Sequence, residues 1–255
     1  MTLKKIRYTD YMRYGIEGVA FDLDGTLYPN YRFNLKLIPF ILKEWRLLLA
    51  FGKARKIIRR EQEKSSSPLS LQKSEIPRSE ISKDNGGFYE YQAGITAKIL
   101  GVQKETIQEK IDLFIYKGWE PLFKKIKLFE KAAETLAALR NAGYKLGLLS
   151  DFPPETKLEY LGISGIWDAV LCSEHCGAIK PHPRPFTELA AAMSLSCEKI
   201  LYVGNSRPYD VAGAARTGMK TAWIKSRLFP GRGAKEPKPD FIFSNYRQLY
   251  NYMLN

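Results

Sequence analysis

Short apolar runs recur along the second half of the chain, and segments with a helical pattern separate them. The runs are residues 144–149, 169–172, 200–203, 221–224 and, as an expected edge strand, 240–243. Helices are predicted at residues 130–142, 185–193 and 209–217, with Gly143 and Gly218 as C-terminal stops. Strands that alternate with helices are typical of a parallel sheet. The pattern therefore predicts an α/β fold with a Rossmann-like parallel sheet core.

One more apolar run, residues 19–21, lies far upstream of the others. More than 100 residues separate it from residue 144, which is far too many for an ordinary connection between strands. Most of this segment has helical character, so it predicts an inserted α-helical domain. Its expected parts are helices at 35–64, 89–100 and 104–116, and a mobile loop rich in Ser, Lys and Pro at 65–87. The predicted domains are an α/β core at 1–30 and 122–255 and a helical domain at 31–121.

A length of 255 residues and a hydrophobic content of 45% allow one full α/β domain and a smaller second one. Three cysteines form no metal-binding pair and are too few for a disulfide framework, which fits a reducing compartment. Residues 1–10 do not resemble a secretory signal, and no apolar segment is long enough to span a membrane. Residues 37–51 are the most apolar stretch, but charged side chains interrupt it, so it is interpreted as a packed helix. We therefore expect a cytoplasmic protein.

The net charge of +13 is concentrated in two stretches. Residues 31–63 contain nine basic and three acidic side chains, and residues 220–239 contain six basic and one acidic side chain. Four of the basic residues would share one face of an unbroken helix: Arg46, Lys53, Lys56 and Arg60. Such a face is either simply solvated or attracts anions, namely a phosphate-bearing substrate or an acidic membrane surface. Nucleic acid is not an expected partner, because the chain has no zinc-finger spacing and no RNA-binding motif.

Two carboxylates stand where the first apolar run ends. Asp22 and Asp24 follow residues 19–21 and flank the start of a turn that Gly25 permits. Open α/β sheets bind their ligands at the carboxyl ends of their strands. A turn that begins at Asp24 lets the two side chains diverge, so that one could attack a substrate while the other handles protons. The simpler alternative is a charged strand end followed by an Asp-Gly turn.

The ends of the later strands supply complementary groups. Ser150 and Asp151 follow one strand and offer a hydroxyl and backbone N–H groups to an anionic oxygen. Lys180 precedes a proline, which restricts its backbone and aims its ammonium group at a fixed point. Asn205 and Asp210 lie beside a glycine turn, and clustered oxygen donors of this kind suit Mg²⁺.

Four motifs in this order resemble those of the haloacid dehalogenase (HAD) superfamily. They are Asp22-Leu23-Asp24-Gly25-Thr26, Ser150, Lys180-Pro181, and Gly204-Asn205-Ser206 with Asp210. The resemblance covers residues 18–28 and about 129–245, and as a set the motifs are very specific. The inserted helices resemble, in position and helical character, the cap of members that carry their insertion after the first motif. The resemblance therefore implies a phosphatase of this superfamily with an inserted helical cap.

The resemblance also implies a role for each matching residue. Asp22 would be the nucleophile that takes the phosphoryl group, and Asp24 would protonate the leaving alcohol and then activate water. The residues that would bind the substrate are Thr26, Ser150, Asp151 and Lys180. The groups that would hold Mg²⁺, the implied cofactor, are Asp22, the carbonyl of Asp24, Asn205 and Asp210.

The expected reaction is hydrolysis of a small phosphomonoester, such as a nucleotide or sugar phosphate, through an aspartyl-phosphate. Asp24 disfavours a dehalogenase, because dehalogenase members lack an acid at this position. Asn205 stands where relatives usually have an aspartate, and the lost charge should weaken Mg²⁺ binding. A catalytically weakened binding or regulatory protein and a phosphomutase are therefore the alternatives. No oligomeric state is predicted.

Overall fold

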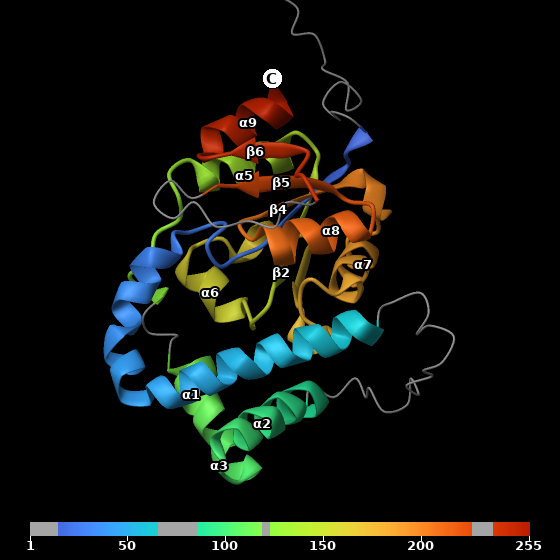
Figure 1. Ribbon diagram of the computed structural model, residues 1–255. Coiled ribbons are helices and arrows are strands. Elements are labelled where there is room, and N and C mark those ends of the chain that lie inside the picture. Colours follow the sequence, from blue (N-terminus) through green and yellow to red (C-terminus); the bar gives the residue numbers. More distant parts are fainter. Residues whose placement is uncertain (1–14, 66–85, 119–122, 226–236) are drawn as a thin grey trace, which may run out of the picture.

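The centre of the molecule is a six-stranded parallel sheet in the order β3-β2-β1-β4-β5-β6 (Figure 1). The computed structural model describes residues 15–65, 86–118, 123–225 and 237–255. The strands are β1 (Gly18–Phe21), β2 (Lys145–Ser150), β3 (Ala169–Cys172), β4 (Ile200–Gly204), β5 (Lys220–Ile224) and β6 (Phe241–Phe243). All six predicted strands are confirmed, and each boundary lies within one residue of its predicted position.

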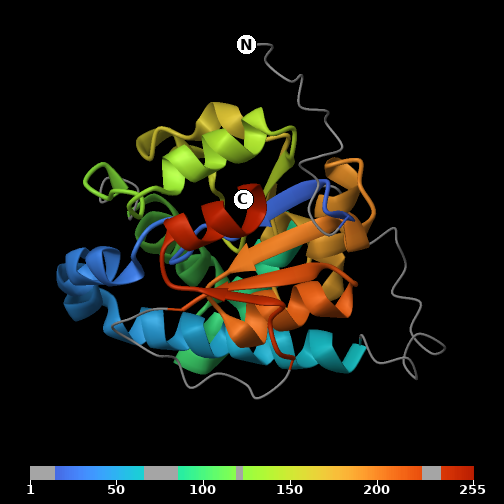
Figure 2. The same cartoon turned by 90° about the horizontal axis from the view of Figure 1, so that it is seen from above.

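Helices cover both faces of this sheet (Figure 2). The helices of this part are α5 (Ala132–Asn141), α6 (Glu155–Tyr160), α7 (Pro183–Ala192), α8 (Ala212–Arg216) and α9 (Tyr246–Leu254). Successive side chains of a strand point to opposite faces. Accordingly, Val19 and Phe21 of β1 pack in the core beneath α5, α6 and α9, whereas Ala20 packs in the core beneath α7 and α8. The predicted Rossmann-like α/β fold is confirmed.

The predicted helix at 209–217 differs from what the pattern indicated. It consists of a π-helical turn, η7 (Arg207–Val211), followed by the short α8. The other short helical turns of this part are η4 (Ser164–Ile166), η5 (Glu174–Cys176) and η6 (Cys197–Lys199). A π-helical turn contains one residue more than an α-helical turn and is frequent at functional sites. Asp210 lies within this turn, and Asn205 lies just before it.

The long connection between β1 and β2 forms a helical insertion, as predicted. Its helices are α1 (Asn30–Ser65), α2 (Gly86–Leu100), α3 (Lys104–Ile111) and the π-helical η3 (Asp112–Lys117). They have a hydrophobic core of their own, which includes Leu47, Phe51, Ala97 and Ile111. The ends of the predicted loop at 65–87 belong to helices, because Ser65 is the last residue of α1 and Gly86 is the first of α2. Residues 66–85 lie outside the described part of the chain.

Among the described side chains of the first half of α1, some apolar ones are buried and others are exposed. Leu37, Leu47, Ala50 and Phe51 are buried, as expected of a packed helix. The exposed ones lie on both sides of a kink at Glu44: Leu35, Ile38, Ile41 and Leu42 before it, and Trp45 and Leu49 after it. The interpretation of residues 37–51 as a packed helix is therefore correct for only part of their apolar side chains. Among the described helices, none is long and apolar enough to cross a membrane.

Candidate active site

The predicted residues meet at the carboxyl ends of β1, β2 and β4. Lys180 lies between two carboxylates: its Nζ is 2.6 Å from Oδ1 of Asp22 and 2.8 Å from Oδ1 of Asp210. It also donates to the carbonyl oxygen of Leu149, 3.3 Å away. All three charged side chains are buried. The sheet thus brings together one cation and two anions that are far apart in the sequence.

Burial and neighbouring charges change the proton affinities of this group. Burial raises the pKa of Asp22 to about 7, with Lys180 acting in the opposite direction and Asp210 and Asp24 adding to the rise. Burial alone would lower the pKa of Lys180, but the carboxylates of Asp210 and Asp22 outweigh it and hold that pKa well above its usual value. Lys180 therefore keeps its charge near neutral pH, whereas Asp22 titrates there.

Thr26 contacts this charged group directly, and Ser150 ends the neighbouring strand β2. The hydroxyl of Thr26 donates to Oδ2 of Asp22 at 2.7 Å. The Ser150 side chain is fully buried at the end of β2, and its Oγ accepts the backbone N–H of Phe152 at 3.2 Å. The Thr26 hydroxyl therefore lies in the turn that follows β1, and the Ser150 hydroxyl lies at the end of β2, the strand that pairs with β1.

Asp151, predicted among the substrate-binding residues, turns its carboxylate toward arginines instead. Its Oδ2 lies 2.8 Å from Nη2 of Arg59 and 3.2 Å from Nη2 of Arg55, and its Oδ1 accepts the Ser173 hydroxyl at 2.6 Å. Burial would raise the pKa of Asp151, but Lys180, Arg55 and Arg59 outweigh it and lower that pKa. The carboxylate of Asp151 therefore fastens the helical insertion to the sheet.

Asp24 has partners that the sequence reasoning missed. Nζ of Lys157, on α6, lies 2.8 and 2.9 Å from the two carboxylate oxygens of Asp24. The Tyr28 hydroxyl donates to the same carboxylate. The main-chain carbonyl of Asp24 accepts the side-chain amides of Asn30 at 3.2 Å and Asn205 at 3.1 Å. The two aspartates of the first motif therefore have separate surroundings, which agrees with the expected division of roles.

The oxygen donors beside Asp22 have a spacing that suits Mg²⁺. Among the described residues, no three His, Cys, Asp or Glu side chains are grouped to hold a metal ion, so a metal would depend on amide and carbonyl oxygens. Turning the Asn205 amide over would place its oxygen about 3.1 Å from the Asp24 carbonyl oxygen. Adjacent ligands of octahedral Mg²⁺ are roughly 3 Å apart, because each metal–oxygen bond is roughly 2.1 Å long. The Asp24 carbonyl and a turned Asn205 amide therefore have the spacing of two adjacent ligands of such an ion.

Asp210 contributes less directly than predicted. One of its oxygens accepts Lys180, and the other accepts the backbone N–H of Ser206 at 2.9 Å. Both oxygens thus have protein partners, and the side chain is 2% exposed. Asp210 therefore holds Lys180 in place and adds negative charge beside Asp22.

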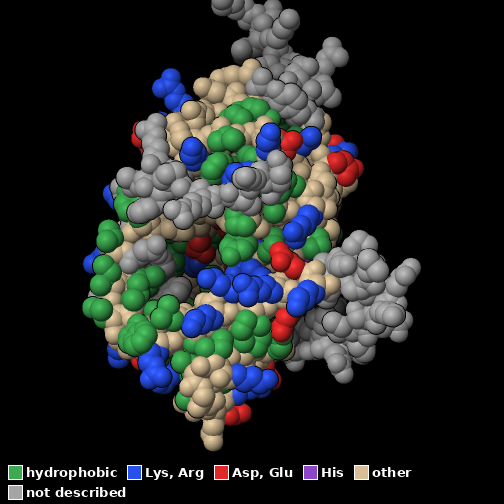
Figure 3. All heavy atoms as spheres, in the orientation of Figure 1, with side chains coloured by type: hydrophobic (Ala, Val, Ile, Leu, Met, Phe, Trp, Pro, Cys, Tyr) green, Lys and Arg blue, Asp and Glu red, His purple; other side chains and the backbone are tan. Residues whose placement is uncertain are grey.

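Two arginines of α1 reach the site, but they are not the ones that the sequence selected. Arg55 forms a buried ion pair with Glu174, and Arg59 donates from Nε to the Lys180 carbonyl at 2.8 Å. Arg46, Lys53, Lys56 and Arg60 are exposed instead. The helical spacing of Arg55 and Arg59 could have identified them. Arg55 follows the buried Phe51 by one helical turn, and Arg59 follows Arg55 by one, so all three share a face of α1. Lys and Arg side chains gather along the face of α1 next to the sheet (Figure 3).

Comparisons with known proteins agree with this geometry. The sequence profile described as "Hydrolase: haloacid dehalogenase-like hydrolase" matches residues 16–218. A glyceraldehyde 3-phosphate phosphatase from Methanopyrus kandleri is 27% identical over 241 residues, which is 92% of this chain and 95% of that protein. A phosphoglycolate phosphatase from Haemophilus influenzae is 26% identical over 161 residues, which is 62% of this chain and 70% of that protein.

Solved structures share the fold. A HAD phosphatase from Thermococcus onnurineus has a TM-score of 0.58 at 22% identity, with 93% of this chain and 97% of that chain covered. A 2-haloacid dehalogenase from Pseudomonas syringae has a TM-score of 0.59 at 19% identity, with 92% and 97% covered. Identities this low establish the fold and nothing further. The profile match spans most of the chain, and the chain therefore belongs to the haloacid dehalogenase-like hydrolase family.

Proposed function

We propose that the protein is a Mg²⁺-dependent phosphatase that hydrolyses a small phosphomonoester through an aspartyl-phosphate on Asp22. The observation that carries this proposal is the arrangement of Asp22 and Asp24 at the end of β1. Asp22 contacts Lys180 and Thr26, and Asp24, two residues further on, is held separately by Lys157. A nucleophile beside a fixed cation, with a second carboxylate nearby, is what transfer to a carboxylate and subsequent hydrolysis require.

The reaction has two steps. In the first, a carboxylate oxygen of Asp22 attacks phosphorus, the bond from phosphorus to the alcohol oxygen breaks, and Asp24 gives that oxygen a proton. In the second, Asp24 takes a proton from water, whose oxygen attacks the phosphorus of the aspartyl-phosphate. Inorganic phosphate leaves, and Asp22 is restored. Lys180, Thr26 and Ser150 stabilise the phosphoryl oxygens by charge and hydrogen bonds.

The metal position would be formed by Asp22, the Asp24 carbonyl and Asn205, with Asp210 behind Lys180. Mg²⁺ bound there supplies positive charge that offsets the charge of the phosphoryl group beside two carboxylates. Asn205 contributes an amide oxygen in place of a carboxylate, so we expect weaker Mg²⁺ binding than in relatives with an aspartate there.

We further propose that residues 31–121 act as a cap over an α/β core of residues 1–30 and 122–255. Arg55 and Arg59 of α1 support this, because they bind Asp151, Glu174 and the Lys180 backbone beside the reaction centre. A cap that covers the site excludes water and selects the alcohol part of the substrate. The relatives named above act on small three-carbon or two-carbon phosphates, as their names state, which supports a small substrate rather than a macromolecule. We place the activity in the cytoplasm.

Two alternatives compete with hydrolysis. A binding or regulatory protein would follow if Asn205 prevented metal binding, and a phosphomutase would follow if a second hydroxyl replaced water as acceptor. Intact Asp22 and Asp24 favour an active enzyme, because a nucleophile and a proton donor would be dispensable in a protein that only binds.

The test is release of inorganic phosphate from nucleotides, sugar phosphates, small phosphorylated acids and p-nitrophenyl phosphate, with Mg²⁺ or with EDTA. Asp22→Asn should abolish release, whereas Asp112→Asn, an exposed carboxylate on the insertion, should not. Release that needs both Mg²⁺ and Asp22 establishes the phosphatase. No release from any compound, with no measurable Mg²⁺ binding, contradicts it and favours the binding protein. Isomerised product without phosphate release identifies a mutase.

A further inference from the structure

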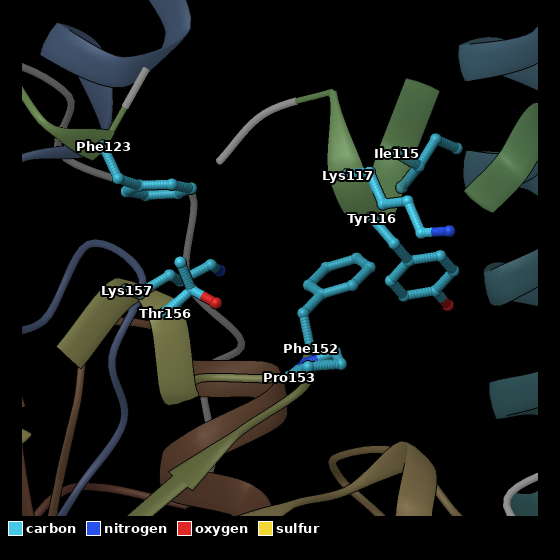
Figure 4. A pocket seen from close by; sticks show the side chains of 8 residues that line it. All are labelled: Ile115, Tyr116, Lys117, Phe123, Phe152, Pro153, Thr156 and Lys157. Carbon is cyan, nitrogen blue, oxygen red and sulfur yellow. The ribbon is translucent and has the colours of Figure 1, made fainter. Parts of the chain in front are cut away.

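A cavity of about 230 Å³ lies between the helical insertion and α6, next to the proposed active site. Figure 4 shows its walls, with Phe123, Thr156 and Lys157 on one side and Phe152 and Tyr116 on the other. Tyr116 and Phe152 meet edge to face at 6.1 Å between ring centroids. The Tyr116 hydroxyl donates to Glu174 at 2.9 Å, so its ring and not its hydroxyl forms the wall.

Lys157 connects this cavity to the reaction centre. Its Nζ binds both carboxylate oxygens of Asp24 and lies 4.9 Å from the Phe123 ring centroid and 5.6 Å from that of Phe152. The side chain is 12% exposed. The ammonium group is therefore held between two rings of the cavity, directly behind the carboxylate that would serve as the acid.

The position of Asp24 also fixes where the alcohol part of a substrate lies. Phosphorus must approach Asp22, and the leaving oxygen must approach Asp24, so the carbon atoms attached to that oxygen extend past Asp24 toward Lys157. The volume of about 230 Å³ is below the roughly 300 Å³ at which pockets for drug-sized ligands begin. The cavity therefore suits a short carbon skeleton.

Lys157 differs from the other basic side chains at the site because its partner, Asp24, must act as the acid in the proposed reaction. Arg55 and Arg59 can keep their carboxylate partners throughout the reaction, and Lys180 can keep Asp210. Asp24 must turn a carboxylate oxygen toward the leaving oxygen, and Lys157, which now binds both of its oxygens, competes for that contact. An anionic group on the substrate can take the place of Asp24 as the partner of Lys157.

We infer that Lys157 selects phosphomonoesters whose short alcohol part carries a second anionic group, such as a carboxylate. The anion binds Lys157, and Asp24 is released toward the leaving oxygen, to which it gives its proton. This inference rests on the proposed phosphatase function and names the class of its substrate as small phosphorylated acids. A neutral alcohol part leaves Lys157 on Asp24 and is a poorer substrate.

Binding of two matched compounds that cannot be hydrolysed tests the assignment without requiring turnover. 3-Phosphonopropionate carries a carboxylate where propylphosphonate carries a methyl group. Calorimetry with Mg²⁺ should show about 10- to 100-fold tighter binding of the acid by the wild-type chain. Lys157→Met should remove this preference, and Lys157→Arg should retain most of it.

The matched control is Lys124→Met, which removes an ammonium group next to another ring, that of Tyr160, at 5.5 Å from its centroid, away from Asp24. It should keep the preference. Three results would overturn the inference. The wild-type chain could bind both compounds equally, the preference could survive in Lys157→Met, or neither compound could bind measurably.

Turnover separates this inference from the proposed function. Phosphate release from 2-phosphoglycolate and from ethyl phosphate compares an acidic with a neutral alcohol part of the same length. A binding preference that depends on Lys157, without phosphate release from any compound, contradicts the phosphatase alone. Asp22-dependent release with equal kcat/KM for both substrates contradicts the role of Lys157 alone. A kcat/KM ratio that falls at least tenfold in Lys157→Met supports both.

Discussion

The side-chain amide nitrogen of Asn205 lies 3.1 Å from the main-chain carbonyl oxygen of Asp24. The Asn205 amide thus donates a hydrogen bond to the Asp24 carbonyl. The aspartate that is usual in the family would place a carboxylate oxygen against that carbonyl oxygen. Two oxygens at that distance need a cation between them, whereas an amide and a carbonyl do not. The hydrogen bond therefore stabilises this pair without a cation, so Mg²⁺ at the proposed position would gain less by binding there.

Asn205→Asp should reverse that relationship. The added carboxylate increases Mg²⁺ affinity by roughly tenfold or more, because it adds a full charge next to the ion. In EDTA the same substitution lowers the free energy of unfolding by roughly 1 kcal/mol, since a carboxylate then faces the Asp24 carbonyl. Calorimetric Mg²⁺ titration and urea unfolding measure the two effects. Asn205→Ala should weaken Mg²⁺ binding, and unchanged affinity in both variants would contradict the assignment of Asn205 to the metal.

Asp22→Asn should stabilise the metal-free protein at neutral pH. The pKa of Asp22 is raised from 3.8 to about 7, so between these values the folded chain keeps a proton that the unfolded chain loses. The stability of the wild type therefore falls as pH rises through this window, while the neutral asparagine has no such dependence. Urea unfolding in EDTA should show a gain of roughly 4 kcal/mol at pH 8 and little difference at pH 4. A difference independent of pH would contradict the raised pKa.

Arg55→Met should destabilise the protein strongly. Arg55 pairs with Glu174 and Asp151, and the Arg55 and Glu174 side chains are 6% and 0% exposed. Removal of the arginine leaves a buried carboxylate without its charge partner, which costs about 3 kcal/mol or more. Arg60→Met, on the exposed side of the same helix, should change stability by less than about 0.5 kcal/mol. Chemical unfolding measures both, and similar effects of the two variants would refute the buried pairing.

Gly25→Ala and Gly52→Ala should change stability in opposite directions. Gly25 has a φ of +90°, and a Cβ there would lie 2.0 Å from the Asn205 amide and 2.5 Å from that of Asn30. The alanine should therefore cost about 2 kcal/mol and disturb phosphate release. Gly52 lies inside α1, where an added Cβ would have no atom within 4 Å, so alanine should add about 0.5–1 kcal/mol. Thermal unfolding of both variants measures the two changes in stability. A stabilised Gly25→Ala protein would contradict the predicted steric clash.

The sheet could be predicted from the sequence because its strands are short, apolar and clearly bounded. Helix α6 (Glu155–Tyr160) was missed, since six residues are too few to show a helical period. The same shortness hid Lys157, which this helix places beside Asp24. Arg55 and Glu174 are 119 positions apart. No sequence pattern links two residues this far apart, so their ion pair could not be predicted from one sequence. The motif residues were found because their order along the chain is itself a signal.

The π-helical turn at Arg207–Val211 has a consequence for how this region can vary. Ser206 and Asp210 are joined by hydrogen bonds across the turn, and Asp210 positions Lys180. Loss of one residue within the turn would rotate Asp210 by roughly 100° about the helix axis and carry its carboxylate away from the lysine. Replacement of a side chain there leaves that alignment in place. The number of residues in this turn is thus under tighter constraint than their identity, so insertions and deletions should be far less tolerated than substitutions.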